Sequence, residues 1–183
     1  MIKFLLSAFR KERKLKDKKR YLISSKVIKY TERVLHDYAN KNPSNEGLVY
    51  WAGKVSNNTI KVTAVIAPNT ESDFGRVSTS HKDNFHVVNE LSKLKLVEVA
   101  QVHSHPGHFV GHSDGDDEWA AFKFEGLLSL VVPNYCKDGM LPLEKCGVHR
   151  YENGEFIRLS TEYVKKHFRL VDDNNSKFVE LRQ

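Results

Sequence analysis

The amino-acid sequence predicts one domain of the α/β (α+β) class, and three observations support that prediction. The chain has 183 residues, of which 40% are hydrophobic and 28% charged, which is ordinary for one globular domain with short extensions. Stretches with apolar residues at helical spacing alternate with short runs typical of strands. Residues 127–132 are apolar at every position except Ser129, as in a central strand that is buried on both faces.

The first half of the body is expected to contain a helix, a hairpin and a second helix. Ser24 and Ser25 are favourable N-cap residues, and apolar side chains recur after them at helical spacing until Asn42-Pro43. Strands are expected at residues 48–54 and 59–67, joined by a turn at Asn57-Asn58. The polar stretch 68–82 is expected to be a loop. The second helix carries its apolar residues on one face: Phe85, Val88, Leu91 and Leu94.

A strand at residues 96–102 should run directly into His103-Ser104-His105-Pro106, where the proline ends its pairing. Ser113 is the expected N-cap of a short helix that passes Trp119 and Phe122. The apolar run 127–132 follows as the central strand.

The remaining elements are a loop, a hairpin, a helix and a polar end. Residues 133–142 are the loop, and strands at 146–151 and 155–159 flank Asn153-Gly154, a strong type I′ turn signal. The last helix should begin near Thr161 and pass Val164 and Phe168. From Asp172 onward the sequence is polar, so the expected organisation is a basic extension (1–20), one domain (21–171) and a polar tail (172–183).

The net charge of +6 is concentrated at the N-terminus. Residues 1–20 hold nine Lys or Arg and two acidic residues, a balance of +7, so that the rest of the chain sums to −1. Such an extension suits nucleic acid, an acidic partner or an anionic membrane surface, and it is equally explained as a solvated segment.

The chain is expected to be cytoplasmic. The apolar patch 4–6 precedes the basic run, which is the reverse of a secretory signal, and no apolar run approaches the roughly 20 residues of a membrane span. Cys136 and Cys146 are too few for a disulfide framework and are expected to be inert thiols.

The segment 103–116 carries the residues with the clearest chemistry. On an extended strand, residues two apart point to the same face, so His103 and His105 project side by side. Asp116, in the first turn of a helix, is positioned to complete a His-His-Asp set. Three protein ligands with a fourth position left to water are typical of a catalytic zinc.

A zinc-activated water also requires a base, and a developing oxyanion requires a donor. Glu46 is a candidate base, although the residues around it do not distinguish it from a surface turn residue. Ser113 has a hydroxyl that could donate to the oxyanion.

Each of these residues has a structural alternative. Ser113 and Asp116 are equally explained as a helix N-cap and a first-turn acid, a variant of the capping box, and Asp114, Asp117 and Glu118 fit that interpretation. His108 and His112 are loop residues or alternative ligands. No role is assigned to the scattered histidines His36, His81, His86, His149 and His167.

The joint spacing of these residues resembles the signature of the JAB/MPN-type (JAMM) metallopeptidases. That signature is an upstream Glu, His-Ser/Thr-His, seven residues, Ser, two residues and Asp. Glu46, His103-Ser104-His105, Ser113 and Asp116 fill every position at that spacing, including the proline after the second histidine. The resemblance extends over about residues 21–170.

The resemblance implies one JAB/MPN-like domain, a mixed central sheet flanked by helices and layered as in cytidine deaminases. It implies His103, His105 and Asp116 as ligands of one Zn²⁺ with a water, Glu46 as general base and Ser113 as oxyanion stabiliser. Family members cleave the peptide or isopeptide bond after the C-terminal glycine of ubiquitin or a ubiquitin-like protein.

A lone domain of this length resembles the bacterial stand-alone branch, which is encoded beside E1-like and E2-like proteins, including those of antiphage defence operons. The expected partner is therefore a ubiquitin-like or E1/E2-conjugated protein, contacted by residues 68–82 and 133–142. Some relatives instead trim sulfur-carrier precursors after a Gly-Gly.

Two other classes of function fit the sequence less well. A catalytically silent JAB-type scaffold usually lacks ligands, whereas none is missing here. A zinc base deaminase needs His-x-Glu and Cys-x-x-Cys, which this chain lacks, and the basic extension alone supports at most nonspecific phosphate contact.

Overall fold

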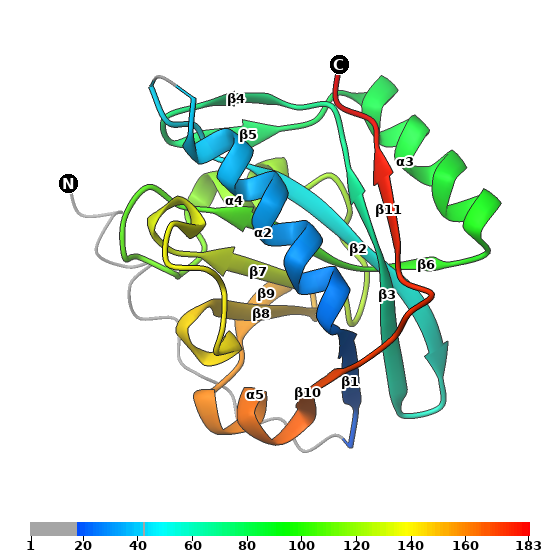
Figure 1. Cartoon of the computed structure of the whole chain (residues 1–183). Coiled ribbons are helices and arrows are strands. Elements are labelled where there is room, and N and C mark those ends of the chain that lie inside the picture. Colours follow the sequence, from blue (N-terminus) through cyan, green and yellow to red (C-terminus); the bar gives the residue numbers. More distant parts are fainter. Residues whose placement is uncertain (1–17, 42) are drawn as a thin grey trace.

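The computed structural model describes residues 18–41 and 43–183, and it contains a large mixed sheet with α2 on one face and α3 on the other (Figure 1). This confirms the α+β class and the single domain. In chain order the elements are β1 (Arg20–Ser24), α2 (Ser25–Ala39), β2 (Leu48–Ser56), β3 (Thr59–Ala67), β4 (Glu71–Asp73), β5 (Arg76–Ser78), α3 (His81–Leu94), β6 (Val97–Ser104), α4 (Asp114–Trp119), β7 (Leu128–Val132), the 3₁₀ turns η1 (Asn134–Cys136) and η2 (Leu143–Lys145), β8 (Gly147–Glu152), β9 (Glu155–Arg158), α5 (Thr161–His167), β10 (Phe168–Val171) and β11 (Lys177–Glu180).

The strand order of the main sheet is β10-β1-β3-β2-β6-β7-β8-β9, and β11 also pairs with β3. The β2–β3, β2–β6 and β7–β8 ladders are antiparallel, whereas β6 and β7 run parallel, with His103 opposite Val131. The carboxyl ends of β6 and β7 therefore meet at one edge of the sheet, where ligand sites of α/β sheets commonly lie.

Two apolar clusters cover the two faces of the sheet. The larger one packs α2 onto the sheet, and Trp51 there donates from Nε1 to Thr31 Oγ1 over 2.7 Å, so its buried polar atom is satisfied. The smaller cluster lies under α3 and contains Tyr50, Val87 and Leu91. As expected, α2 begins with Ser24 as its N-cap, because the Ser24 hydroxyl accepts from the Lys26 N–H.

The predicted face of α3 was wrong in part. Phe85 and Val88 are 63% and 46% exposed, while Val87 and Leu91 are buried. The side of α3 that packs on the smaller cluster is centred on the i, i+4 pair Val87 and Leu91, and Phe85 and Val88 lie outside this buried stripe.

The ends of the described chain are more ordered than the sequence predicted. The last helix ends at His167, and Phe168 begins β10, where its ring stacks on Tyr21 of β1 at 4.4 Å between centroids. The expected polar tail contains β11, which runs beside β3 in parallel register from Lys177 to Glu180 (Figure 1). The basic extension falls largely on residues 1–17, outside the described residues.

None of the described helices has both the length and the apolar character that crossing a bilayer requires. The expected cytoplasmic location stays a prediction.

Glu98 of β6 provides a test of how burial in the sheet affects stability. It is 7% exposed, its Oε1 has no hydrogen-bond partner in the part of the chain that the structure describes, and burial raises its pKa to about 8. The carboxyl of the unfolded chain has an ordinary pKa of 4.5, so the folded state binds the extra proton between about pH 4.5 and 8 and stability falls across that window. Glu98→Gln should remove this loss, which is on the order of 4 kcal/mol at the upper end.

The measurement is urea unfolding of the wild type and Glu98→Gln across that pH window. The stabilisation by the variant should be near zero at the acidic end and grow toward pH 8, with the exposed Glu118→Gln as a control that shows no such growth. Parallel curves for wild type and variant would contradict the assignment.

Candidate metal centre

The two histidines of the His-x-His segment lie where β6 leaves the sheet. His103 is the next-to-last residue of the strand, and the ladder to β7 continues for one more residue through His105 N–H, which donates to Val132 O over 2.9 Å. The backbone is therefore still extended at His105, and both imidazoles point to the same face. Both side chains are buried, at 4% and 7% exposure.

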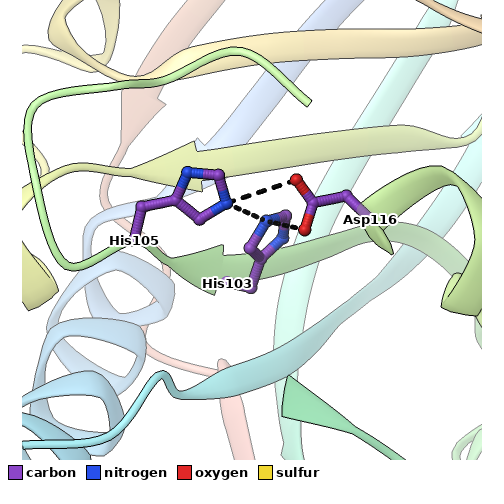
Figure 2. Close-up of side chains that lie close together, drawn as sticks. All are labelled: His103, His105 and Asp116. Carbon is purple, nitrogen blue, oxygen red and sulfur yellow. Dashed lines mark hydrogen bonds and ion pairs between the residues drawn. The ribbon is translucent and has the colours of Figure 1, made fainter. Parts of the chain in front are cut away.

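Asp116 reaches these histidines from the first turn of α4. Ser113 caps this helix: its Oγ accepts from Asp116 N–H over 3.1 Å, and its own N–H donates to Asp116 Oδ2 over 2.7 Å. This reciprocal capping box fixes the start of the helix and directs the Asp116 carboxylate toward the histidines (Figure 2).

The three side chains converge on one point. His103 Nε2 lies 3.3 Å from Asp116 Oδ1, His105 Nε2 lies 3.2 Å from Asp116 Oδ2, and the two Nε2 atoms are 3.2 Å apart (Figure 2). Ligand atoms around a tetrahedral zinc with bonds of about 2.0–2.1 Å are separated by roughly 3.3–3.4 Å. The spacing therefore fits a single metal ion held by His103, His105 and Asp116.

A further contact orients one of the imidazoles as a ligand. His105 Nδ1 lies 3.0 Å from Phe109 O, which can only accept, so Nδ1 carries the proton and the Nε2 lone pair is directed at Asp116 and His103. An imidazole whose other nitrogen donates to a carbonyl is a common arrangement among metal-ligating histidines.

The electrostatics of the cluster favour an ionised Asp116. Burial acts to raise its pKa, but the charges and hydrogen bonds of His103 and His105 hold that pKa well below its usual range. Burial lowers the pKa of His103, whereas for His105 the bond and charge of Asp116 outweigh burial and raise the pKa. Deprotonated Asp and neutral His103 are the forms that bind a metal.

Glu46 lies beside this cluster without belonging to it. It is 4% exposed, and burial raises its pKa to about 7, with His105 acting in the opposite direction and Asp116 adding to the rise. Its backbone is fixed on one side by Glu46 N–H donating to Asp73 O over 2.9 Å. A carboxylate whose pKa is near neutrality is suited to accepting and returning a proton.

Ser104 holds the backbone next to Glu46 through two hydrogen bonds to Gly47. Its side chain points away from the two histidines and is fully buried, and its Oγ accepts from Gly47 N–H over 3.0 Å. Its own N–H donates to Gly47 O over 3.1 Å. A side chain at Gly47 is excluded, because an added Cβ would lie 2.8 Å from the Tyr38 ring. Ser104 and Gly47 therefore tie the Glu46 segment to the end of β6.

The expected loop 68–82 contains the small hairpin β4–β5, whose turn lies beside the site. Tyr135 of η1 connects this hairpin to the segment after His105: its hydroxyl donates to Phe74 O over 2.7 Å and its N–H donates to His105 O over 2.7 Å. Asn134, Tyr135 and Cys136 have φ values of 51°, 51° and 63°. Left-handed backbone costs roughly 1–2 kcal/mol per non-glycine residue, so this strained turn is maintained by the contacts it makes around the site.

Two hollows of different size lie on either side of the cluster, and Glu46, Ser113 and Asp116 line both. The hollow beside His105 measures about 700 Å³ and is walled by Pro106 and Phe109. The hollow beside His103 measures about 50 Å³ and lies between β5 and α4.

The residues proposed from the sequence as alternative ligands lie elsewhere. His108 is exposed, and His112 is buried with both ring nitrogens engaged, by Asp117 and Ser129. The buried contacts of Ser104 and Tyr135 were not anticipated. For Ser104 a signal was present: it is the polar residue that strand alternation sends to the opposite face from the histidines.

Comparison with known proteins gives one relative by sequence and a fold match by structure. No protein-family model matches the chain. A curated protein of Sinorhizobium fredii named probable metalloprotease y4jG is 32% identical over 98 residues, which amount to 51% of this chain and 60% of that protein. The chain thus matches about 60% of its relative's length. The solution structure of protein DSY2949 from Desulfitobacterium hafniense aligns with a TM-score of 0.61 over 84% of this chain and 94% of that one, at 15% identity, which supports the fold alone.

Removal of one ligand tests the metal centre. His105→Ala should lose most bound metal, because two protein ligands hold an ion far less tightly than three. The measurement is metal per chain by elemental analysis, with exposed His108→Ala as the matched control. Stoichiometric metal in His105→Ala would place the ion elsewhere.

Loss of the Ser104 hydroxyl tests the anchor of Glu46. Ser104→Ala leaves the buried Gly47 N–H without its acceptor, and the free energy of unfolding should fall by about 1–3 kcal/mol. Ser104→Thr keeps the hydroxyl and should retain more of this free energy. Urea unfolding measures the difference, and an unchanged midpoint for Ser104→Ala would show that the bond is not needed.

Proposed function

We propose that this chain is a zinc-dependent peptidase of the JAB/MPN (JAMM) type that hydrolyses the peptide or isopeptide bond after the C-terminal glycine of a ubiquitin-like protein or of a protein conjugated by an E1/E2-like system. The observation that carries the proposal is the convergence of the His103, His105 and Asp116 ligand atoms within 3.2–3.3 Å of one another. The name of the Sinorhizobium relative, probable metalloprotease, agrees with a peptidase.

Two imidazoles and one carboxylate, with space left beside them, suit zinc in a catalytic site. When bound, zinc would supply Lewis-acid polarisation of the scissile carbonyl and would lower the pKa of a water.

Glu46 is the proposed proton carrier. Its carboxylate, with a pKa of about 7, accepts the proton of the attacking water and later delivers it to the leaving nitrogen. Because Glu46 is buried and lines both hollows, it can act on either side of the scissile bond.

Ser113 is the proposed donor to the oxyanion. Its Oγ accepts from Asp116 N–H, and that bond does not use the hydroxyl proton, which can be donated to the carbonyl oxygen as negative charge develops there.

The unequal hollows support a glycine on one side of the scissile bond. The hollow of about 50 Å³ between β5 and α4 has little room for a side chain, whereas the one of about 700 Å³ can take the bulk of a leaving group; Gly75 and Gly115 line both hollows. The exposed edge of the β4–β5 hairpin could pair with an extended tail. The role in antiphage defence stays a prediction from the resemblance.

Replacement of the base tests this mechanism. Glu46→Gln should lower turnover of a ubiquitin-like fusion ending in Gly-Gly by about 10²–10⁴-fold and leave bound metal unchanged, because it removes a proton carrier and no ligand. The assay should include linear and isopeptide-linked fusions and a matched fusion in which the glycines are replaced.

Glu155→Gln, an exposed change on β9 and outside the proposed site, is the control and should retain activity. Full turnover by Glu46→Gln would make the base assignment wrong. Cleavage without regard to the glycines would make the substrate assignment wrong.

A further inference from the structure

Helix α4 carries a proposed metal ligand, Asp116, yet it has little to hold it on the protein. It is six residues long and none of its residues is buried. Trp119 at its end is 46% exposed, and the Arg76 guanidinium lies 4.2 Å from the centre of its ring. Apolar packing therefore contributes little to the position of α4, and polar contacts have a correspondingly larger part in it.

His112 supplies such a contact from the sheet side. Its side chain is fully buried, and Nδ1 lies 2.8 Å from Asp117 Oδ1, on the residue that follows the ligand Asp116. Its Nε2 lies 2.8 Å from Ser129 Oγ, in the middle of β7. Gln101 of β6 donates to the same Ser129 Oγ over 3.2 Å.

The hydrogen bonds in this chain have one consistent direction. The Asp117 carboxylate can only accept, so His112 Nδ1 carries a proton, and in the tautomer with its single proton on Nδ1 the Nε2 atom is an acceptor. Ser129 then donates its hydroxyl proton to His112 and accepts from Gln101. These three bonds, from Gln101 to Ser129, between Ser129 and His112 and from His112 to Asp117, are compatible in direction and engage both ring nitrogens, which restricts the ring orientation.

The surroundings of His112 hold the ring in place. It packs against His149 at 4.3 Å and Phe156 at 4.7 Å between centroids. Gly147 allows the loop before His112 to lie directly on β8, since an added Cβ there would meet Val110 O at 1.7 Å. The ring centroid is 6.0 Å from that of His103, and both ring nitrogens are already engaged, so His112 is not arranged as a fourth ligand.

We propose that His112 is a positioning residue for the metal centre: it ties Asp117, and with it the first turn of α4, to the two central strands, and so holds Asp116 at the distance that metal binding requires. This inference rests on the proposed metal centre and deepens it.

Zinc affinity is the measurement that tests the inference, by competition with a chromophoric chelator on the purified full-length chain near neutral pH. His112→Ala should bind zinc about 10- to 100-fold more weakly than the wild type, the range typical when a contact behind a metal ligand is removed. Ser129→Ala should weaken binding less, because the His112–Asp117 bond remains. His108→Ala, an exposed change in the same loop, should match the wild type.

Two conservative variants separate positioning from simple filling of space. The side-chain amide of Asn can replace Nδ1–H, so His112→Asn retains a donor for Asp117, whereas the longer Gln places its amide near Nε2 and loses it. His112→Asn should therefore recover part of the zinc affinity and His112→Gln should not. Comparison of these two variants shows whether His112 acts through its hydrogen bond to Asp117, even if His112→Ala fails to fold. Thermal unfolding of each metal-free protein should be measured alongside its zinc affinity.

The outcomes are distinguishable. The positioning role would be overturned if His112→Ala bound zinc as tightly as the wild type. It would also be overturned if His112→Asn and His112→Gln lost equal zinc affinity in proportion to their loss of thermal stability. Absence of zinc binding in the wild type would instead overturn the metal centre, and the inference with it.

Discussion

The centre depends on the alternation of side chains along the last residues of β6. Because the strand remains extended through His105, the two imidazoles lie on one face and Ser104 on the other. The same three residues therefore provide two candidate ligand atoms 3.2 Å apart and the hydroxyl that accepts from Gly47 N–H, next to Glu46. The parallel pairing with β7 maintains the extended backbone up to this point.

The rest of the centre is held mainly by polar contacts. A capping box directs Asp116, and backbone hydrogen bonds to the β4–β5 hairpin and to β6 hold the Glu46 segment. Helix α4 is connected to the sheet by the hydrogen bonds of His112. Hydrogen bonds between buried groups are strong and directional, so they can place side chains accurately where apolar packing is absent. The same burial accounts for the pKa of about 7 at Glu46, because removal from water disfavours its charge.

Much of the local structure could be predicted, because it depends on neighbouring residues. The bounds of β3, the N-cap Ser24 and the turn at Asn153-Gly154 agree with the structure. The strands β1, β10 and β11 were not predicted, since they are short and their stability comes from pairing with distant segments. The buried face of α3 was predicted incorrectly because periodicity alone does not say how wide the surface beneath a helix is.

The candidate site likewise has one part that could be predicted from the sequence and one part that could not. Residue spacing alone places His103 and His105 on one face and predicts the Ser113–Asp116 cap, because strand period and helix capping are local properties. The position of Glu46 beside them depends on the tertiary structure, through the bond between Gly47 and Ser104, which are 57 positions apart. The tertiary structure also decides that His112, a possible ligand by sequence, contacts Asp117 instead. Those contacts depend on strand register and on which faces are buried together, and neither quantity is contained in the spacing of residues along the sequence.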